Sequence, residues 1–280
     1  MTFNPVAALN IIECKSLIGE KKPKAMDLGS QTSSLSSKFI KNLIEKSLYI
    51  NNIQKKNLEK LTNMEFSTKD FFQSLGYENY MSIDINGAHE SYQFDLNKNI
   101  IETYQFNNKY DLVINNGTGE HVFDQHSLFI NFHNLTKKDG LMLNLLPFID
   151  WINHGFYNFN PIFFADLAAS NNYDLIKISF ANRDGLELKL DKKDYAILFE
   201  QIKPNRNDTK FEKVIKLAKE KIGKNIILVV ILRKKIDQSF KLPLQGKYLR
   251  DVQDFATPYQ EQNLGSQVAS NQLADNDKRK

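Results

Sequence analysis

Apolar residues along the chain fall into short continuous runs that alternate with segments of helical spacing. The continuous runs predict strands over residues 24–28, 79–87, 91–97, 109–117, 141–148, 175–182 and 225–235. Apolar residues at helical spacing predict helices over residues 33–48, 69–76, 126–140, 161–172 and 211–223. This alternation predicts the α/β class: a three-layer αβα sandwich around a doubly wound, mostly parallel seven-stranded sheet. Because the strand runs are almost wholly apolar, we expect both faces of the sheet to be covered.

The same pattern defines the domain organisation. Residues 1–250 read as a single domain, with insertions expected near residues 49–70 and 183–224, where apolar positions become sparse. Residues 251–280 are polar with few apolar anchors, so we expect a disordered tail there.

Composition narrows the class of protein. Hydrophobic residues make up 41% of the 280 residues and charged residues 25%, which is ordinary for a globular protein. The net charge of +4 comes from scattered lysines, which argues against a nucleic-acid partner. The single cysteine, Cys14, excludes an internal disulfide and suits a reducing cytoplasm. The absence of zinc-type Cys/His spacing leads us to expect no metal site, and the oligomeric state is not indicated.

The chain shows no membrane signal in its sequence. Its first residues lack the positive start and apolar core of a signal peptide, and no apolar run reaches the length that crosses a bilayer. We therefore expect a cytoplasmic protein without a membrane partner.

The stretch MDLGSQTSS, residues 26–34, places Asp27, Gly29 and Ser30 at the end of the first strand. Ligands of doubly wound sheets bind at the carboxyl ends of the strands. Gly29 has no side chain, so we expect a ligand to lie against its backbone, and the helix that follows to offer free N–H groups. Asp84 and Asp95 end the next two strands, where one carboxylate can accept two ribose hydroxyls and the other can meet an adenine amino group.

These motifs resemble those of the class I S-adenosylmethionine-dependent methyltransferases, a Rossmann-like family. The similar stretches are Asp27-Leu28-Gly29, Asp84-Ile85-Asn86, Asp95-Leu96-Asn97, YDLVINNGTGEHVFD (110–124) and KKDGLMLNLLPF (137–148). The resemblance covers roughly residues 24–182 and implies a last strand that runs antiparallel. It also implies S-adenosylmethionine as cofactor, held by Asp27, Gly29, Ser30, Asp84, Ile85, Asp95, Leu96, Asn115 and Asn116. The motifs G-x-G-x-x-G and GxxxxGK[ST], typical of dinucleotide and P-loop sites, are absent from the sequence.

The resemblance implies methyl transfer to an oxygen or nitrogen nucleophile of a small molecule. The sequence is loosely similar to bacterial methyltransferases of sugars and other small metabolites. Removal of the nucleophile's proton suits a histidine, whose pKa is ordinarily ~6.5. His154 is preferred over His121 because polar and aromatic residues surround it. The aromatic loop after the fifth strand supplies the candidate acceptor-binding residues Trp151, Tyr157, Asn158 and Asn160.

Two other classes stay open at the level of sequence. Ser30, Gln31 and Thr32 follow Gly29 where the family usually carries further glycines, which favours a non-catalytic module that keeps the fold and binds a partner. An aminopropyltransferase would need an added acidic pair for its polyamine, and the sequence offers no position for one.

Overall fold

The computed structural model describes residues 2–190 and 209–245. Within these residues, seven strands form one sheet in the order β2-β1-β3-β4-β7-β5-β6. Their bounds are β1 Lys24–Asp27, β2 Asn79–Ser82, β3 Tyr110–Asn116, β4 Thr136–Ile149, β5 Tyr173–Ala181, β6 Glu187–Lys189 and β7 Ile226–Lys234. Strands β1 to β5 share one direction, whereas β6 and β7 run opposite to it. The predicted fold class and the antiparallel last strand are thereby confirmed.

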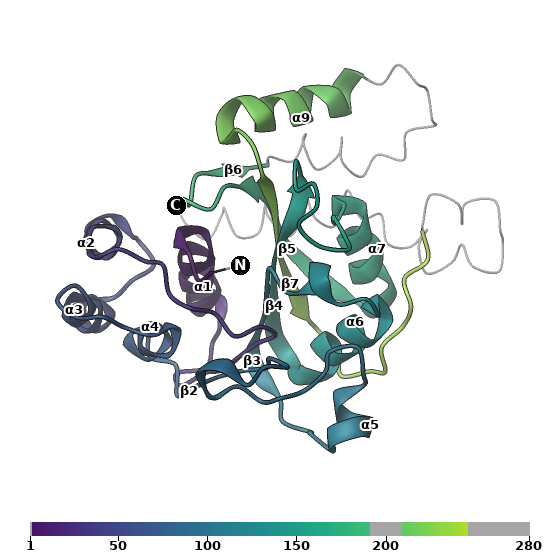
Figure 1. Ribbon diagram of the computed structural model, residues 1–280, viewed down its shortest axis with the longest axis horizontal. Helices are drawn as coiled ribbons and strands as arrows, with labels where there is room; N and C mark the ends of the chain where they lie inside the picture. The colour runs from purple at the N-terminus through teal and green to yellow at the C-terminus, as the bar shows by residue number, and fades with distance from the viewer. Residues whose placement is uncertain (1, 191–208, 246–280) are drawn as a thin grey trace.

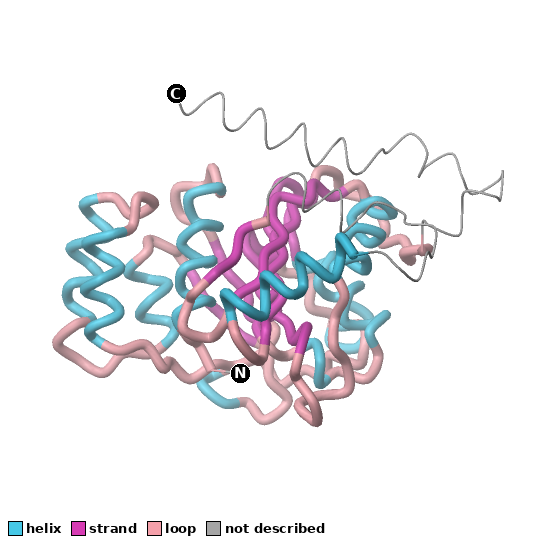
Figure 2. The backbone as a smooth tube through the Cα atoms, turned by 90° about the horizontal axis from the view of Figure 1, so that it is seen from above, coloured by secondary structure: helices cyan, strands magenta, loops and turns pink. Residues whose placement is uncertain are grey.

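Helices cover both faces of this sheet, which gives the three layers (Figure 1). One face carries α1 Pro5–Leu17, α2 Ser37–Lys46, α3 Asn52–Leu61 and α4 Thr68–Ser74. The other carries α5 Ile100–Tyr104, α6 Gln125–Leu135, α7 Pro161–Asn171 and α9 Thr209–Ile222. Two short 3-10 helices, η1 Ala88–Glu90 and η2 Gly119–His121, follow β2 and β3. Figure 2 shows the strands in the middle of the molecule with helices to either side.

The core has two halves because the side chains of each central strand alternate between the faces. In β7, Leu228 and Val230 pack toward the α6 and α7 layer, whereas Ile227 and Val229 pack toward the α1 layer. All four side chains are fully buried. This double coverage explains why β7 reads as an uninterrupted apolar run in the sequence.

The strand predicted over residues 91–97 is wrong, since this segment makes only an isolated bridge between Ile83 and Tyr92. Its aromatic side chains pack on one another, on Tyr104 at the end of α5 and on Phe106 just after it. Phe94 stacks on Tyr104 with ring centroids 4.3 Å apart, and the Asp95 N–H donates to the Tyr104 hydroxyl. The seventh strand is instead β6, a short partner of β5 inside the segment predicted as an insertion.

Several element bounds also differ from the sequence prediction. Helix α1 was not predicted. Buried residues surround its axis, so the sequence shows no separate apolar face. Its start does carry helix signals, since Asn4 caps it and Pro5 is its first residue. Helix α2 is shorter than predicted, and Leu48 beyond it is 96% exposed. The segment 137–140 belongs to β4 instead of ending α6, and the Lys137 ammonium pairs with Asp111 of β3 at 2.9 Å.

The predicted insertion at 49–70 contains α3 and the start of α4, and Gly76 follows α4 with a positive φ of 85°. The predicted tail at 251–280 and residues 191–208 of the second insertion lie outside the described residues.

Candidate functional site

A cleft of about 320 Å³ opens at the carboxyl ends of the parallel strands, where β1 lies between β2 and β3. The chain order reverses at this point, which is where doubly wound sheets bind ligands. Six of the predicted cofactor residues line the cleft: Gly29, Ser30, Asp84, Ile85, Asp95 and Leu96. The structure therefore brings together residues that lie up to 67 positions apart in the chain (96 minus 29).

Asp84 joins two loops of this cleft. Its Oδ2 accepts from the Ser30 N–H at 3.2 Å, and its Oδ1 accepts from the Asn86 N–H at 3.2 Å. The next residue, Ile85, is 71% exposed although it is apolar, so it presents an apolar surface to the cavity. A carboxylate beside an exposed apolar side chain suits a ribose next to a planar base.

Asp95 lies on the other wall of the cleft and is partly exposed. Its Oδ1 accepts from the side-chain and backbone N–H groups of Asn97, both at 2.9 Å. These hydrogen bonds lower the pKa of the Asp95 carboxyl, with the side-chain bond contributing most. Asp95 therefore presents a carboxylate, which can accept hydrogen bonds only.

Gly29 is required here for a reason other than the one the sequence suggested. A Cβ at this position would lie 2.0 Å from the Thr118 Oγ1, so the threonine occupies the space beside the glycine. The expected helix N–H groups are also absent from the turn, because α2 begins only at Ser37. The cleft is lined after Gly29 by Ser30 and Gln31, which precede α2.

Asp27 lies beneath this turn and does not line the cleft. It is 1% exposed; its Oδ1 accepts from the Gly29 N–H at 3.3 Å and its Oδ2 from the Tyr80 hydroxyl at 3.4 Å. Burial raises the pKa of the Asp27 carboxyl to about 8, against the lowering effect of those two hydrogen bonds. Its structural task is to hold the turn that carries Gly29.

Asn115 and Asn116 end β3 and are likewise buried beneath the cleft. The Asn115 Oδ1 accepts from the Gly119 N–H at 2.8 Å and so shapes the loop that leads into η2. The cleft itself is lined there by Gly117 and Thr118. The Asn115 side chain thus positions the lining residues, whereas Asn116 contributes its backbone carbonyl, which accepts from the Gln31 Nε2 at 3.1 Å.

Both candidate catalytic histidines meet at Glu120, which is not among the site residues predicted from the sequence. The Glu120 Oε1 lies 3.2 Å from the His154 Nε2 and 3.7 Å from the His121 Nε2. The two imidazole rings meet edge to face, with centroids 5.1 Å apart. His121 also lines the cleft, so the cluster lies at the end of the cleft that faces the loop after β4.

Burial governs the charges of this cluster. Glu120 has no exposed surface, and burial raises the pKa of its carboxyl to about 7. Burial also lowers the pKa of His121 and of His154, and for His154 the neighbouring His121 lowers it further. Both imidazoles are therefore biased toward the neutral form.

The loop after β4 folds down onto Glu120. The Phe156 N–H donates to the Glu120 carbonyl at 2.7 Å. Trp151 is 7% exposed and donates its indole N–H to the Ile226 carbonyl at 2.9 Å, while its ring lies 4.8 Å from His154. Trp151 thus packs against His154 and does not line the cleft, and its predicted contact with an acceptor stays a prediction.

Gly155 permits this close approach, because a Cβ there would lie 2.8 Å from the Glu120 Cγ and 2.9 Å from its carbonyl oxygen. We expect Gly155→Ala to lower the free energy of unfolding by roughly 1–3 kcal/mol through overpacking. Urea unfolding followed by circular dichroism measures this. Gly19→Ala is the matched control, since a Cβ at Gly19 would meet nothing within 4 Å. Equal losses in both proteins would contradict the contact.

Tyr157, Asn158 and Asn160 line a different cavity of about 370 Å³, beside α7. The Tyr157 hydroxyl donates to the Phe123 carbonyl at 3.0 Å, which ties the loop after β4 to the segment after η2. The structure therefore does not bring these three predicted acceptor residues into the cleft that His121 lines.

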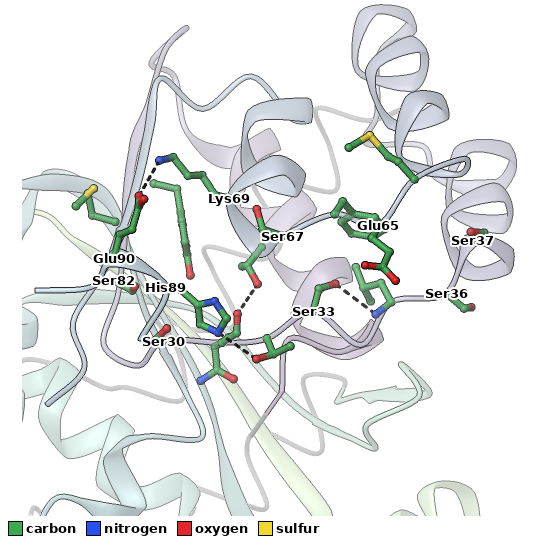
Figure 3. A pocket seen from close by; sticks show the side chains of 18 residues that line it. Ser30, Ser33, Ser36, Ser37, Glu65, Ser67, Lys69, Ser82, His89 and Glu90 are labelled. Carbon is green, nitrogen blue, oxygen red and sulfur yellow. Dashed lines mark hydrogen bonds and ion pairs between the residues drawn. The ribbon is translucent and has the colours of Figure 1, made fainter. Parts of the chain in front are cut away.

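A larger cavity of about 940 Å³ (Figure 3) shares Ser30 and Gln31 with the cleft as lining residues. Its lining is rich in hydroxyls from loops distant in sequence, and the Thr68 hydroxyl donates to the Gln31 carbonyl at 2.8 Å. At its rim, Lys69 pairs with Glu90 at 3.8 Å. The sequence did not predict this cavity, because its lining residues come from several segments and not from one motif.

No family model matches the sequence, and no curated protein is similar enough to match. Solved structures do match. They include an O-methyltransferase from a trans-AT polyketide synthase of Brevibacillus brevis with S-adenosyl-L-homocysteine (12% identity, 81% of this chain and 71% of that chain, TM-score 0.40). They also include an S-adenosylmethionine-dependent methyltransferase from Archaeoglobus fulgidus (12%, 81% and 90%, 0.43). A third is coclaurine N-methyltransferase with N-methylheliamine and S-adenosylhomocysteine (10%, 81% and 72%, 0.37).

The helices were also compared with what crossing a bilayer requires. Across residues 2–190 and 209–245, none of them combines the necessary length with the necessary apolar character.

Proposed function

We propose that the protein is an S-adenosylmethionine-dependent methyltransferase that acts on an oxygen or nitrogen of a small molecule. The observation that carries this proposal is the cleft at the switch point, where Asp84 and Ile85 stand opposite Asp95 and the cavity ends at His121. This arrangement offers an acceptor for ribose hydroxyls, an apolar surface for adenine and polar groups at the reacting end.

The residues of the cleft fit the cofactor in kind. Asp84 would accept from the ribose hydroxyls, Ile85 and Leu96 would flank the base, and Asp95 would accept from the adenine amino group. When bound, S-adenosylmethionine supplies a methyl group on a positively charged sulfur, which an incoming nucleophile can displace in line. Asp27 and Asn115 act from beneath the cleft, through the turns that they hold, and Asn116 lies buried beside them.

The reacting end of the cleft would be built by His121, His154 and Glu120. In this proposal both histidines contact the acceptor's reacting atom, and Trp151 and Gly155 hold the loop that carries His154 in place. Orientation of this kind supplies much of the rate of a displacement between two bound molecules.

We expect S-adenosylhomocysteine to raise the unfolding temperature of the protein, because a ligand that binds only the folded state stabilises it. Asp84→Ala should weaken the affinity roughly 10- to 100-fold through the loss of charge-assisted hydrogen bonds. Titration calorimetry measures both proteins. Asp184→Ala is the control, since Asp184 lies exposed in a turn away from the cleft.

A second function is favoured by one observation, the Thr118 hydroxyl that fills the space beside Gly29. A cleft floor closed in this way suits a module that keeps the fold and binds a partner without catalysis. If S-adenosylhomocysteine at millimolar concentration left the unfolding temperature unchanged, the methyltransferase proposal would fail and this second function would stand.

A further inference from the structure

Glu120, His121 and His154 present one carboxylate oxygen and two imidazole nitrogens to the same space. The three ligand atoms lie within 4.8 Å of one another. The Glu120 Oε1 is 3.2 Å from the His154 Nε2 and 3.7 Å from the His121 Nε2. The residues come from two separate loops, η2 after β3 and the loop after β4, so the fold assembles the set.

These separations suit ligands of a common ion. Two atoms bound to zinc at ~2.0–2.1 Å lie about 3.4 Å apart in a tetrahedral site, and no more than ~4.2 Å apart in any geometry. Both carboxylate-to-imidazole distances fall within this limit. The third distance joins the imidazole nitrogens of His121 and His154. A rotation of the His121 side chain, which is 46% exposed and therefore has room to move, would shorten it.

The burial of Glu120 also indicates a missing positive charge. The residue is 0% exposed, and its Oε2 is buried without a hydrogen-bond partner among the described residues. Within the part of the chain that the structure describes, the side-chain partners of this carboxylate are the two histidines, whose imidazoles are biased toward the neutral form and do not balance its charge. A buried carboxylate is costly unless a cation or several donors balance it. A divalent ion would supply that balance.

We propose that Glu120, His121 and His154 bind one divalent transition-metal ion, of the zinc type, with an open position toward the cleft. Two histidines and one glutamate with a free fourth position are a ligand set that catalytic zinc sites use. The site was not expected from the sequence, which has no zinc-type spacing, because the ligands are brought together only by the fold of the loop after β4.

The role of the ion rests on the proposed function, whereas its binding does not. If the protein methylates a hydroxyl, the open position would take the acceptor oxygen, and a metal-bound hydroxyl releases its proton far more readily than a free one. His121 and His154 would then serve as ligands that position the acceptor. The predicted role of a histidine as proton acceptor would fall to solvent.

Zinc binding to the full chain tests the proposal directly. The purified protein is treated with a chelator, exchanged into metal-free buffer and titrated with Zn²⁺ by calorimetry, with visible absorption of bound Co²⁺ as a second readout. We expect one ion per chain, and at least tenfold weaker binding in Glu120→Gln, His121→Ala and His154→Ala. His126→Ala is the matched control, since His126 is exposed on α6 and outside the cluster.

Absence of Zn²⁺ binding to the unmodified chain would overturn the proposal, as would equal weakening by His126→Ala. Unchanged binding in all three cluster variants would do the same, leaving a hydrogen-bonded cluster only. Circular dichroism shows whether each variant folds, and His121→Ala stays informative if the buried Glu120→Gln does not, because its side chain is half exposed. Asp84→Ala separates the two proposals: it should weaken S-adenosylhomocysteine binding yet keep Zn²⁺, and His154→Ala, whose side chain does not line the cleft, should do the reverse.

Discussion

Replacing Lys177 by methionine should lower the free energy of unfolding by about 3–5 kcal/mol. The ammonium of Lys177 in β5 is nearly fully buried and donates to the Asn10 Oδ1 at 2.8 Å and the Glu13 Oε2 at 2.7 Å, both in α1. It also pairs with the Glu187 Oε1 in β6 at 2.6 Å. Methionine is unbranched and one atom shorter than lysine, and it leaves two largely buried carboxylates without their cation.

Chemical denaturation followed by circular dichroism measures this loss. The matched control is Lys109→Met, because Lys109 pairs with Asp237 at the surface, where the two side chains are 42% and 57% exposed. Surface pairs contribute only ~0–1 kcal/mol. Adding Glu13→Gln and Glu187→Gln to Lys177→Met should restore part of the stability, since the carboxylates then carry no charge. A loss no larger than that of the control would show that water already solvates these carboxylates.

Asp27→Asn should raise stability at neutral and mildly alkaline pH. Burial raises the pKa of Asp27 to about 8 in the folded protein, whereas an exposed aspartate has a value of 3.8. Between these values the folded chain holds a proton that the unfolded chain has released, so the stability of the unmodified protein falls as pH rises from about 4 to about 8. At pH 7 the cost is on the order of 4 kcal/mol.

Asparagine matches the shape of the protonated carboxyl and can still accept from the Gly29 N–H, but it does not titrate. The difference in unfolding free energy between Asp27→Asn and the unmodified protein should therefore be small near pH 4 and grow toward pH 8. Urea unfolding at a series of pH values measures it, with Asp184→Asn as the exposed control. A difference that stays constant across this range would mean that Asp27 is ionised in the folded protein.

The parts of the fold that the sequence predicted are those with a local physical signature. Strands β3, β4 and β7 are covered on both faces, so their apolar runs are unbroken and easily recognised. Helix α1 and strand β6 lack such signatures, because α1 is buried around most of its axis and β6 has only three residues. The segment 91–97 alternates like a strand but uses its aromatic residues for local packing.

In the candidate site too, the residues that the sequence could predict are those placed by a local pattern. Asp84 reaches the cleft because it follows β2, and the carboxyl ends of parallel strands meet at one edge of the sheet, which a sequence can predict. Asp95 also lines the cleft, but its segment is not a strand, so its position depends on the local packing of Phe94 on Tyr104. The burial of Glu120 beneath Gly155, and the packing of Thr118 against Gly29, depend on loops far apart in the chain. No residue pattern near Glu120 reveals that the loop after β4 will close over it.

The position of β7 has a consequence for how the protein is made. This strand lies between β4 and β5, so it joins a sheet of β2, β1, β3 and β4 to the hairpin of β5 and β6. The ribosome must therefore reach Lys234 before the two halves can combine. Until then β4 and β5 each present an unpaired edge, and such edges are templates for aggregation. The edges of β4 and β5 are therefore where we expect wrong pairing of the nascent chain to begin, even though the finished sheet is covered on both faces.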